Sequence, residues 1–361
     1  MSHPYKGISD HCFWPKAMSV PAPGHIDPVT TANLITADEK VATMGSCFAQ
    51  HLAKHISRSG LDYFVAEQAP EGMDDKTASD KNYGVFSARY GNIYTVRQAV
   101  QLYDRAFGNF TPAERAWVRP DGRWVDAFRP QIEPEGFDSP EHVDIAADTH
   151  LAHVRRVFTE SKWLVFTLGL TEAWISKADG AVYPIAPGVK GGDYDPERYS
   201  FINFSLAEVY EDLQAFIAKI HAVNPDIQIL LTISPVALMA TYEPRHVLVS
   251  TICSKSILRV AADQAERKYP NVIYFPSYEI ITSPAAEGRY YEDDLRQVTE
   301  LGVSHVMRVF SKHFIEGGQT QAHSLTVELE QENADIVCDE EVIQDAIRDS
   351  ALTPRKSNRP R

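Results

Sequence analysis

The sequence predicts an α/β fold built around a central parallel sheet. Three almost wholly apolar runs have the length of strands, at residues 162–169, 227–233 and 272–275. Continuous apolar runs are typical of strands that are buried on both faces, as in parallel sheets. Helical patterns separate the three runs. This alternation of strand and helix indicates a sheet that is covered by helices on both sides.

The composition narrows the class of protein. The chain has 361 residues, of which 44% are hydrophobic, and this is enough for one large core. The formal net charge of −14 argues against a nucleic-acid partner or an anionic membrane surface, since either would need a basic face. No apolar run is long enough to span a bilayer, and no signal peptide is evident, so we expect a cytoplasmic protein.

The cysteine and histidine patterns predict no metal site and no cofactor. The four cysteines are far apart and form no Cys-x-x-Cys pair, which disfavours a disulfide framework or a structural zinc site. Cys47 is expected to pack in an apolar helix rather than to act as a thiol nucleophile. His150 and His153 have no carboxylate on the same helical face, which favours a solvated helix over a metal site.

The chain divides into three regions. Residues 1–38 are rich in Pro, His and Gly and predict an extended arm that crosses the surface. Residues 39–314 form the α/β domain. Residues 315–361 are first acidic and then basic with prolines, which predicts a mostly mobile tail.

The domain begins with a strand, a tight turn and a helix. An apolar run ends at Gly45, Ser46 follows, and apolar residues then recur every four positions from Phe48 to Ile56. Backbone N–H groups at such a helix N-terminus favour negative charge. An acyl-transfer enzyme needs its nucleophile in such a place, because the same groups can stabilise an oxyanion. The alternative is that Ser46 only caps the helix.

Loops separate this unit from the apolar strands. A short strand is expected at 61–66, an irregular stretch at 67–95 and an amphipathic helix at 96–107. Residues 108–140 carry several prolines and a Pro-Asp-Gly turn, which predicts a small insertion with a hairpin at 116–128.

The second half of the domain alternates helices with the apolar strands. Helices are predicted at 141–160, 204–223, 250–268 and 299–314, and residues 177–204 are predicted to be irregular. Polar residues follow each strand directly, and these are Ser46, Thr171 with Glu172, Ser234, and Ser277 with Glu279. Ligands of open α/β sheets bind at the carboxyl ends of the strands, so we expect the functional site at this edge.

Several short blocks in a fixed order resemble a known family. Residues 45–49 read Gly-Ser-Cys-Phe-Ala, the signature from which the GSCFA family takes its name. Similar blocks follow at 90–94, 167–172, 232–236, 254–256 and 274–279. The chain therefore resembles the GSCFA family, which belongs with the SGNH/GDSL-type hydrolases, from about residue 40 to 314. The resemblance implies a flavodoxin-like three-layer α/β/α sandwich.

The resemblance also implies the roles of several site residues. Ser46 would be the nucleophile of ester hydrolysis or acyl transfer. In the superfamily, the oxyanion is held by the serine N–H, a glycine N–H and an asparagine side chain. Gly91 is the candidate for the glycine, and Thr171 stands in place of the asparagine, where it offers a hydroxyl but no amide. Asn92 and Glu172, in the same blocks, are further candidates.

The usual base is absent from this sequence. The superfamily supplies Asp-x-x-His before the last helix, and Asp294 and Gln297 occupy those positions here. Glutamine cannot accept the proton of a serine. Three explanations remain open: another histidine, His305 or His246, enters the site; Asp294 or Glu172 serves as base with a pKa raised by burial; or the site binds an acylated ligand without catalysis.

The leading functional hypothesis follows from the resemblance. The protein would be an SGNH-type serine esterase or O-acyltransferase that acts on a small acyl ester, most plausibly acetyl, of a saccharide or a related metabolite. The alternative is a catalytically impaired module that binds acylated glycans. The three long loops would wall the pocket, and Tyr90, Trp124 and Trp174 would stack on sugar rings. The sequence leaves open the acyl group, the acceptor and the oligomeric state.

Overall fold

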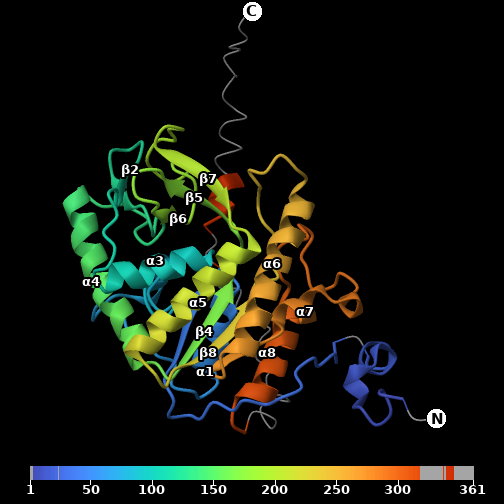
Figure 1. The fold of residues 1–361 in the computed structure, drawn as a ribbon. Helices are drawn as coiled ribbons and strands as arrows, with labels where there is room; N and C mark the ends of the chain where they lie inside the picture. Colours follow the sequence, from blue (N-terminus) through green and yellow to red (C-terminus); the bar gives the residue numbers. More distant parts are fainter. Residues whose placement is uncertain (1–2, 23, 318–335, 337–338, 345–361) are drawn as a thin grey trace, which may run out of the picture.

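The core of the protein is a four-stranded parallel sheet (Figure 1). The computed structural model describes the chain except for residues 1–2, 23, 318–335, 337–338 and 345–361. The sheet has the order β1-β4-β8-β9 and consists of β1 (Val41–Gly45), β4 (Trp163–Leu168), β8 (Gln228–Ile233) and β9 (Val272–Tyr274). All three pairings are parallel, so the predicted α/β class is confirmed.

Helices cover both faces of the sheet and make a three-layer sandwich. One layer holds α1 (Ala49–Arg58), α7 (Ser277–Thr282) and α8 (Glu300–Phe314). The other layer holds α3 (Val96–Ala106), α4 (Pro140–Glu160), α5 (Leu206–Val223) and α6 (Val247–Lys268). The predicted three-layer α/β/α architecture is therefore confirmed. No helix in the described part of the chain is long and apolar enough to cross a membrane.

Alternate residues of each strand face the two helical layers. In β4, Leu164 and Phe166 pack toward α5, whereas Trp163 and Val165 pack toward α1 and α8. Successive side chains of a strand point to opposite faces, so a strand between two helical layers needs apolar residues at every position. This requirement explains the unbroken apolar runs of the sequence.

Local sequence signals set the starts of the later helices. Ser205 caps α5, where its side chain accepts the Glu208 N–H and the Glu208 carboxylate reaches back to the Ser205 N–H. Thr299 caps α8 through the Gly302 N–H. Such caps satisfy N–H groups that have no partner within the helix.

Two smaller sheets lie beyond the carboxyl ends of the core strands. The predicted hairpin is present as β2 (Ala116–Val118) and β3 (Trp124–Asp126). A three-stranded antiparallel sheet consists of β5 (Glu172–Ser176), β6 (Val182–Tyr183) and β7 (Tyr199–Asn203). The prediction that 177–204 is irregular was therefore wrong. β6 has only two residues, β5 and β7 are mostly half-exposed, and none of the three has the continuous apolar run that marks a doubly buried strand.

The predicted strand at 61–66 is reduced to a single bridge. Tyr63 pairs with Val41 in parallel, and the Phe64 N–H donates to the Val41 carbonyl at 2.9 Å. The segment turns at Leu61, whose carbonyl accepts the Tyr63 N–H, so the ladder does not extend. A short helix, α2 (Asp75–Asp80), interrupts the loop that follows.

The N-terminal arm lies against α8. Ile35 bridges Ile315 in parallel, and the Asp27 carboxylate contacts His313 at 2.8 Å. The arm is not extended throughout, since it includes helical turns at Asp10–Cys12 and Pro15–Ser19.

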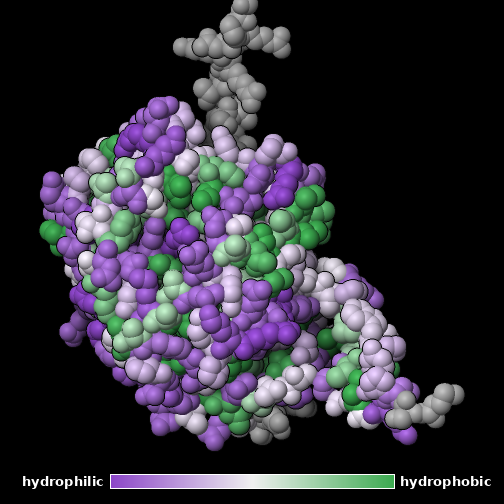
Figure 2. Space-filling view, in the orientation of Figure 1, coloured by the Kyte–Doolittle hydropathy of each residue, from purple (hydrophilic) through white to green (hydrophobic). Residues whose placement is uncertain are grey.

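Apolar side chains gather at one place on the surface that Figure 2 shows. They lie over the upper end of α6, where Leu248, Val249 and Ile252 are exposed. This end of α6 follows the loop 236–246, which borders the site described below.

Candidate active site

Ser46 lies in the turn between β1 and α1, with its hydroxyl buried. The residue is 2% exposed, and its Oγ has no hydrogen-bond partner among the described residues. Phe48 occupies the N-cap position of α1, and no side chain caps that helix. The alternative that Ser46 is only a helix cap is therefore wrong. A buried hydroxyl without a partner is costly, and it is a typical mark of a functional residue.

Two glycines let the backbone close tightly around Ser46. Gly45 has φ +134°, and a Cβ there would lie 2.3 Å from the Thr167 carbonyl oxygen. A Cβ on Gly169 would lie 2.9 Å from the Tyr94 oxygen and 3.0 Å from the Ser46 Cβ. Only glycine fits at either position, and the end of β4 therefore lies directly against the Ser46 side chain.

This packing predicts the effect of a substitution at Gly169. We expect Gly169→Ala to destabilise the protein by about 1–3 kcal/mol, because the added methyl group overpacks the site. The methyl group would also displace Ser46, so any activity that depends on Ser46 should fall more than the stability loss explains. Thermal unfolding and ester hydrolysis measure the two effects. Gly180→Ala is the comparison: its φ of +73° makes alanine strained, but a Cβ there meets open space, so this variant should lose stability without a further loss of hydrolysis. A loss of hydrolysis that is equal in the two variants would contradict the close contact at Gly169.

The loop 91–94 also reaches Ser46. The Ile93 N–H donates to the Gly45 carbonyl at 2.8 Å, and the Tyr94 carbonyl accepts the N–H groups of Gly169 and Leu170 at 3.1 and 3.0 Å. The structure therefore brings the Ser46, Gly91–Asn92 and Gly169–Thr171 blocks together at the edge where the strands end.

Two of the three expected oxyanion donors are engaged within the protein. The Ser46 N–H donates to the Thr167 carbonyl at 3.1 Å. The Thr171 hydroxyl donates to Asn203 at 2.7 Å, and the Thr171 N–H donates to the Ser254 hydroxyl at 3.0 Å. Gly91, the third expected donor, is half-buried and has φ +66°, and a Cβ there would meet open space.

The segment before α8 presents an arginine to the site rather than an acid. Asp294 is exposed, and its carboxylate accepts the N–H groups of Arg296 and Gln297 at 2.8 and 2.9 Å. Gln297 is exposed as well and donates to Glu341 at 3.3 Å. Arg296 is only 7% exposed and donates to the Ala237 carbonyl at 3.0 Å.

The structure does not bring either histidine to Ser46. The ring nitrogens of His305 lie 2.7 Å from the Tyr290 hydroxyl and 2.7 Å from the Ile26 carbonyl, so both are engaged beside the N-terminal arm. Burial lowers the pKa of His305 to about 4. His246 caps α6, where its Nδ1 accepts the Leu248 N–H. His305 therefore holds the arm to α8, and the expectation that it serves as the base is corrected.

Glu172 is held by the loop after β8. Its carboxylate accepts the Thr241 hydroxyl at 2.7 Å and the Tyr242 N–H at 3.3 Å. Burial raises the pKa of Glu172. These contacts tie the start of β5 to residues 241–242.

Lys255 is the buried basic residue that the sequence interpretation did not assign. It is 2% exposed on α6, and its Nζ donates to the Gly169 carbonyl at 2.6 Å. Burial lowers its pKa to about 8, and the Cys47 thiol and the Glu340 carboxylate act in the opposite direction. Lys255 lies on the buried face of the helix with Leu258. In the sequence, Lys255 stands three residues before the apolar Leu258. This spacing places both side chains on one face of a helix, and it was the available signal that Lys255 is buried.

A short C-terminal segment, residues 339–344, closes over this site. In Figure 1 it is the red segment between the β5–β7 sheet and the upper end of α6. The Asp339 carboxylate accepts both the N–H and the Nδ2 of Asn92, and also Gln131. Glu340 pairs with Arg296 at 2.9 Å. Of the tail predicted to be mobile, residues 315–317, 336 and 339–344 are described, and both Ile315 and this segment are packed against the domain.

Some expected site residues lie in the core instead. Tyr90 is 1% exposed, and its hydroxyl donates to the Thr43 carbonyl, so it cannot stack on a sugar. His150 is buried and contacts the Glu67 carboxylate at 2.6 Å. The prediction that it faces solvent was therefore wrong, because this face of α4 packs against a polar cluster that consists of Glu67, Asp126 and Arg129.

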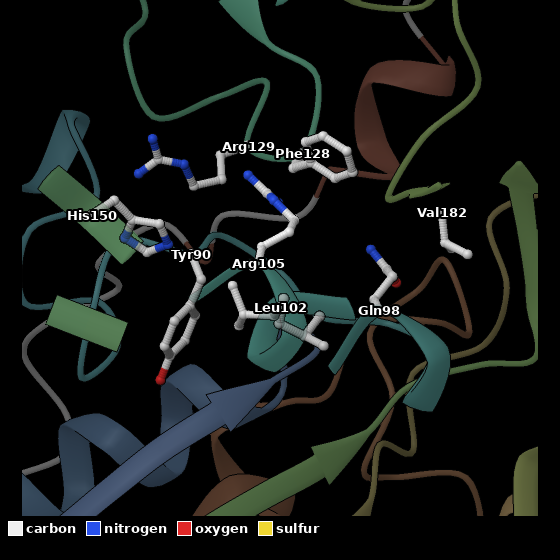
Figure 3. Close-up of a pocket in the computed structure, with 9 residues that line it drawn as sticks. Tyr90, Gln98, Leu102, Arg105, Phe128, Arg129, His150 and Val182 are labelled. Atoms are coloured by element: carbon white, nitrogen blue, oxygen red, sulfur yellow. The ribbon is translucent and has the colours of Figure 1, made fainter. Parts of the chain in front are cut away.

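A small cavity lies beside this polar cluster and is separate from Ser46 (Figure 3). Figure 3 shows Arg105, Arg129 and His150 around it, with the Tyr90 hydroxyl directed away toward β1. Its volume of about 20 Å³ is room for about one water molecule. The cavity is too small to be a substrate pocket.

Trp174 belongs to a half-exposed aromatic group on the second sheet. Its ring centroid lies 5.2 Å from Tyr194, 5.9 Å from Phe201 and 4.9 Å from Tyr242. Tyr194 and Tyr242 are exposed. Trp124 lies in the hairpin strand β3 and is half-buried.

Comparisons with known proteins give one family. The profile of the GSCFA family matches residues 40–310. No curated protein matches the chain. The chain is also similar to solved structures. One is a mutant of an acetyl esterase with an acetate ion, at 11% identity and TM-score 0.34; the match covers 81% of this chain and 98% of that one.

Two further solved structures have the same low identity. A carbohydrate esterase family 3 protein from Talaromyces cellulolyticus is 11% identical with TM-score 0.34, covering 82% of this chain and 100% of that one. An acetyl xylan esterase from the rumen bacterium Butyrivibrio proteoclasticus is 11% identical with TM-score 0.23, covering 68% of this chain and 56% of that one. The fold class rests on the strand order and layers described above.

Proposed function

The chain belongs to the GSCFA family, and from this premise we propose that it is a serine esterase or O-acyltransferase with Ser46 as the nucleophile. The observation that carries the proposal is the buried Ser46 hydroxyl without a partner among the described residues, at the edge where Asn92, Gly169 and Lys255 meet. The substrate is a small acyl ester, most plausibly an acetyl ester, of a saccharide or related metabolite.

Lys255 is the residue that we assign as the base. Its Nζ binds the carbonyl of Gly169, the residue that packs against the Ser46 side chain. The Ser46 Oγ has no partner among the described residues, so the neutral Nζ must turn from that carbonyl to accept the Ser46 proton. A pKa of about 8 leaves a useful fraction of Lys255 neutral near pH 7–8. Glutamine at position 297 cannot do this, and Asp294 is engaged with backbone N–H groups.

The reaction proceeds in two acyl transfers. The Ser46 hydroxyl gives its proton to the Lys255 Nζ while Oγ bonds to the ester carbonyl carbon. The resulting tetrahedral intermediate collapses when its C–O bond to the alcohol breaks, and the alcohol leaves with the proton from Lys255. Water, or an acceptor hydroxyl in a transferase, then attacks the acyl-serine by the same route.

The oxyanion hole is assigned to Gly91 and Asn92. The Asn92 N–H and Nδ2 already bind an anionic oxygen, since they donate to the Asp339 carboxylate. Groups that are oriented in advance toward a negatively charged oxygen are what a tetrahedral intermediate needs. Ser46 and Thr171, whose N–H groups donate elsewhere, have the smaller share in this assignment.

The aromatic group around Trp174 is the proposed surface for the sugar. It begins two residues after Glu172, next to the Thr171 block, and two of its rings are exposed. We expect Trp174→Ala to raise the KM for an acetylated sugar by about tenfold, since ring stacking contributes about 1 kcal/mol or more. The KM for p-nitrophenyl acetate should not change. Trp124→Ala is the matched control, and an equal rise of KM in both variants would contradict the assignment.

A panel of esters tests the proposed function. We expect the wild-type chain to hydrolyse p-nitrophenyl acetate faster than longer acyl esters, and to form a covalent adduct with a fluorophosphonate that intact mass spectrometry detects. A transferase would show its activity when a saccharide acceptor is added. If no ester is cleaved or transferred and no adduct forms, the enzyme proposal fails.

The alternative function is a module that binds acylated glycans without turnover. The glutamine at the usual histidine position favours it. Binding of an acetylated glycan that is unchanged in Ser46→Ala, together with no ester cleavage in either form, would support this alternative.

A further inference from the structure

Two buried cations lie near Ser46, at a place that we call the cation site. Lys255 and Arg296 are 2% and 7% exposed. Their charges act on each other, since Arg296 lowers the pKa of Lys255. Among the described residues, the carboxylate that acts on Lys255 and pairs with Arg296 is Glu340. Unpaired buried charges are strongly unfavourable, so the cation site requires an anionic partner.

In this structure the occupant comes from the chain itself. Glu340 lies outside the sheet and its helical layers. It also lies beyond residues 40–310, which the family profile matches. Its carboxylate accepts from the Arg296 Nη2 at 2.9 Å and from the Met239 N–H at 3.5 Å. Asp339 beside it fills the position on Asn92 that we assign to the oxyanion. The segment therefore places carboxylates on Arg296 and Asn92, as an acidic substrate would.

Ser46 is closed to an ester in this arrangement of the chain, and the segment is docked on Asn92 and Tyr94 of the loop beside it. Ser46 is 2% exposed and its Oγ is buried, although an ester carbonyl must come into contact with that atom. Asp339 also donates its N–H to the Tyr94 hydroxyl at 3.0 Å. Binding of an ester requires that these contacts be replaced.

We propose, on the basis of the esterase function above, that the cation site binds a substrate with a carboxylate, and that Arg296 holds this carboxylate in the position that Glu340 occupies here. The substrate class is an acylated acidic saccharide, such as an ester of a uronic acid. The planar guanidinium of Arg296 suits a carboxylate, because it can donate two parallel hydrogen bonds. The docked segment and the substrate compete for the same site.

Titration calorimetry of the full-length protein with D-glucuronate tests the proposal, with D-glucose as the neutral ligand. We expect Glu340→Gln to bind glucuronate about tenfold tighter than the wild type, because the competing carboxylate is gone. Neither protein should bind glucose. Glu341→Gln, which removes the adjacent carboxylate that faces Gln297, should behave as the wild type.

A second substitution shows whether Arg296 holds the carboxylate. Adding Arg296→Gln to Glu340→Gln should abolish glucuronate binding. If that double variant does not fold, Arg296→Lys keeps the charge but loses the planar fork, and it should weaken binding. The proposal is overturned if Glu340→Gln binds glucuronate no better than glucose, or if loss of Arg296 leaves glucuronate binding intact.

The ester assay separates this proposal from the proposed function. Cleavage of p-nitrophenyl acetate by Glu340→Gln without any glucuronate binding would refute the acidic subsite alone. Glucuronate binding without cleavage of any ester and without a fluorophosphonate adduct would refute the esterase function alone, and the subsite would stand.

Discussion

Ser46→Ala is expected to reduce ester hydrolysis to the rate of the spontaneous reaction. Loss of a serine nucleophile removes the covalent route, and the expected decrease in kcat is about 10⁴-fold or more. The fluorophosphonate adduct should disappear with the activity. The variant should fold normally, because the Ser46 hydroxyl makes no hydrogen bond within the described residues. Stability should even rise slightly, since a buried polar group without a partner is removed.

A matched serine provides the control for this result. Ser234 follows β8, which lies two strands from β1 in the sheet, and it is buried like Ser46, but its hydroxyl accepts the Val236 N–H at 3.3 Å. Ser234→Ala should keep the adduct and most of the activity. Hydrolysis that survives in Ser46→Ala at the wild-type rate would show that another residue is the nucleophile. Cys47, which is buried in the same turn, is the next candidate.

The layers of the fold were predictable because they rest on local patterns. The apolar runs at 163–168 and 228–233 are strands buried between two helical layers, and a sequence shows such burial directly. Caps such as Ser205 and Thr299 also act over three residues, so they are visible locally. The β5–β7 sheet was missed because β6 is only two residues long, and because β5 and β7 are mostly half-exposed and pair across a loop of more than 20 residues.

The site was only partly predictable because its parts come from distant segments. Position 297 matches the family block for a histidine, but Arg296, one residue earlier, is the side chain that the turn buries. Lys255 reaches Gly169 from 86 residues away, and Glu340 reaches Arg296 from 44 residues away. Neither pairing has a local signal in the sequence. The resemblance indicated the nucleophile, and the contacts of the folded chain were needed to suggest a base.

The pH dependence of the reaction distinguishes Lys255 from the other candidate bases. A lysine base acts when it is neutral, so kcat/KM should rise with pH and reach half its maximum near pH 8, the pKa of buried Lys255. A carboxylate base such as Glu172 would instead give a half-maximum in the acid range. Glu340→Gln removes a negative charge that raises the pKa of Lys255, so the midpoint should move to lower pH in that variant.

Lys255→Met should remove this pH dependence and lower kcat about 10²–10⁴-fold, the range for loss of a general base. The variant should fold, because methionine replaces a buried charge with an uncharged side chain. Burial lowers the pKa of Lys255 from 10.5 to about 8, so between these values the unfolded chain binds more protons and the stability of the wild type rises with pH. Below pH 8 the buried charge is unfavourable, and methionine, which carries no charge, should be tolerated there. Lys268→Met, in the exposed last turn of α6, is the control. A Lys255→Met enzyme with the wild-type profile would exclude Lys255 as the base and leave the activation of Ser46 to another group.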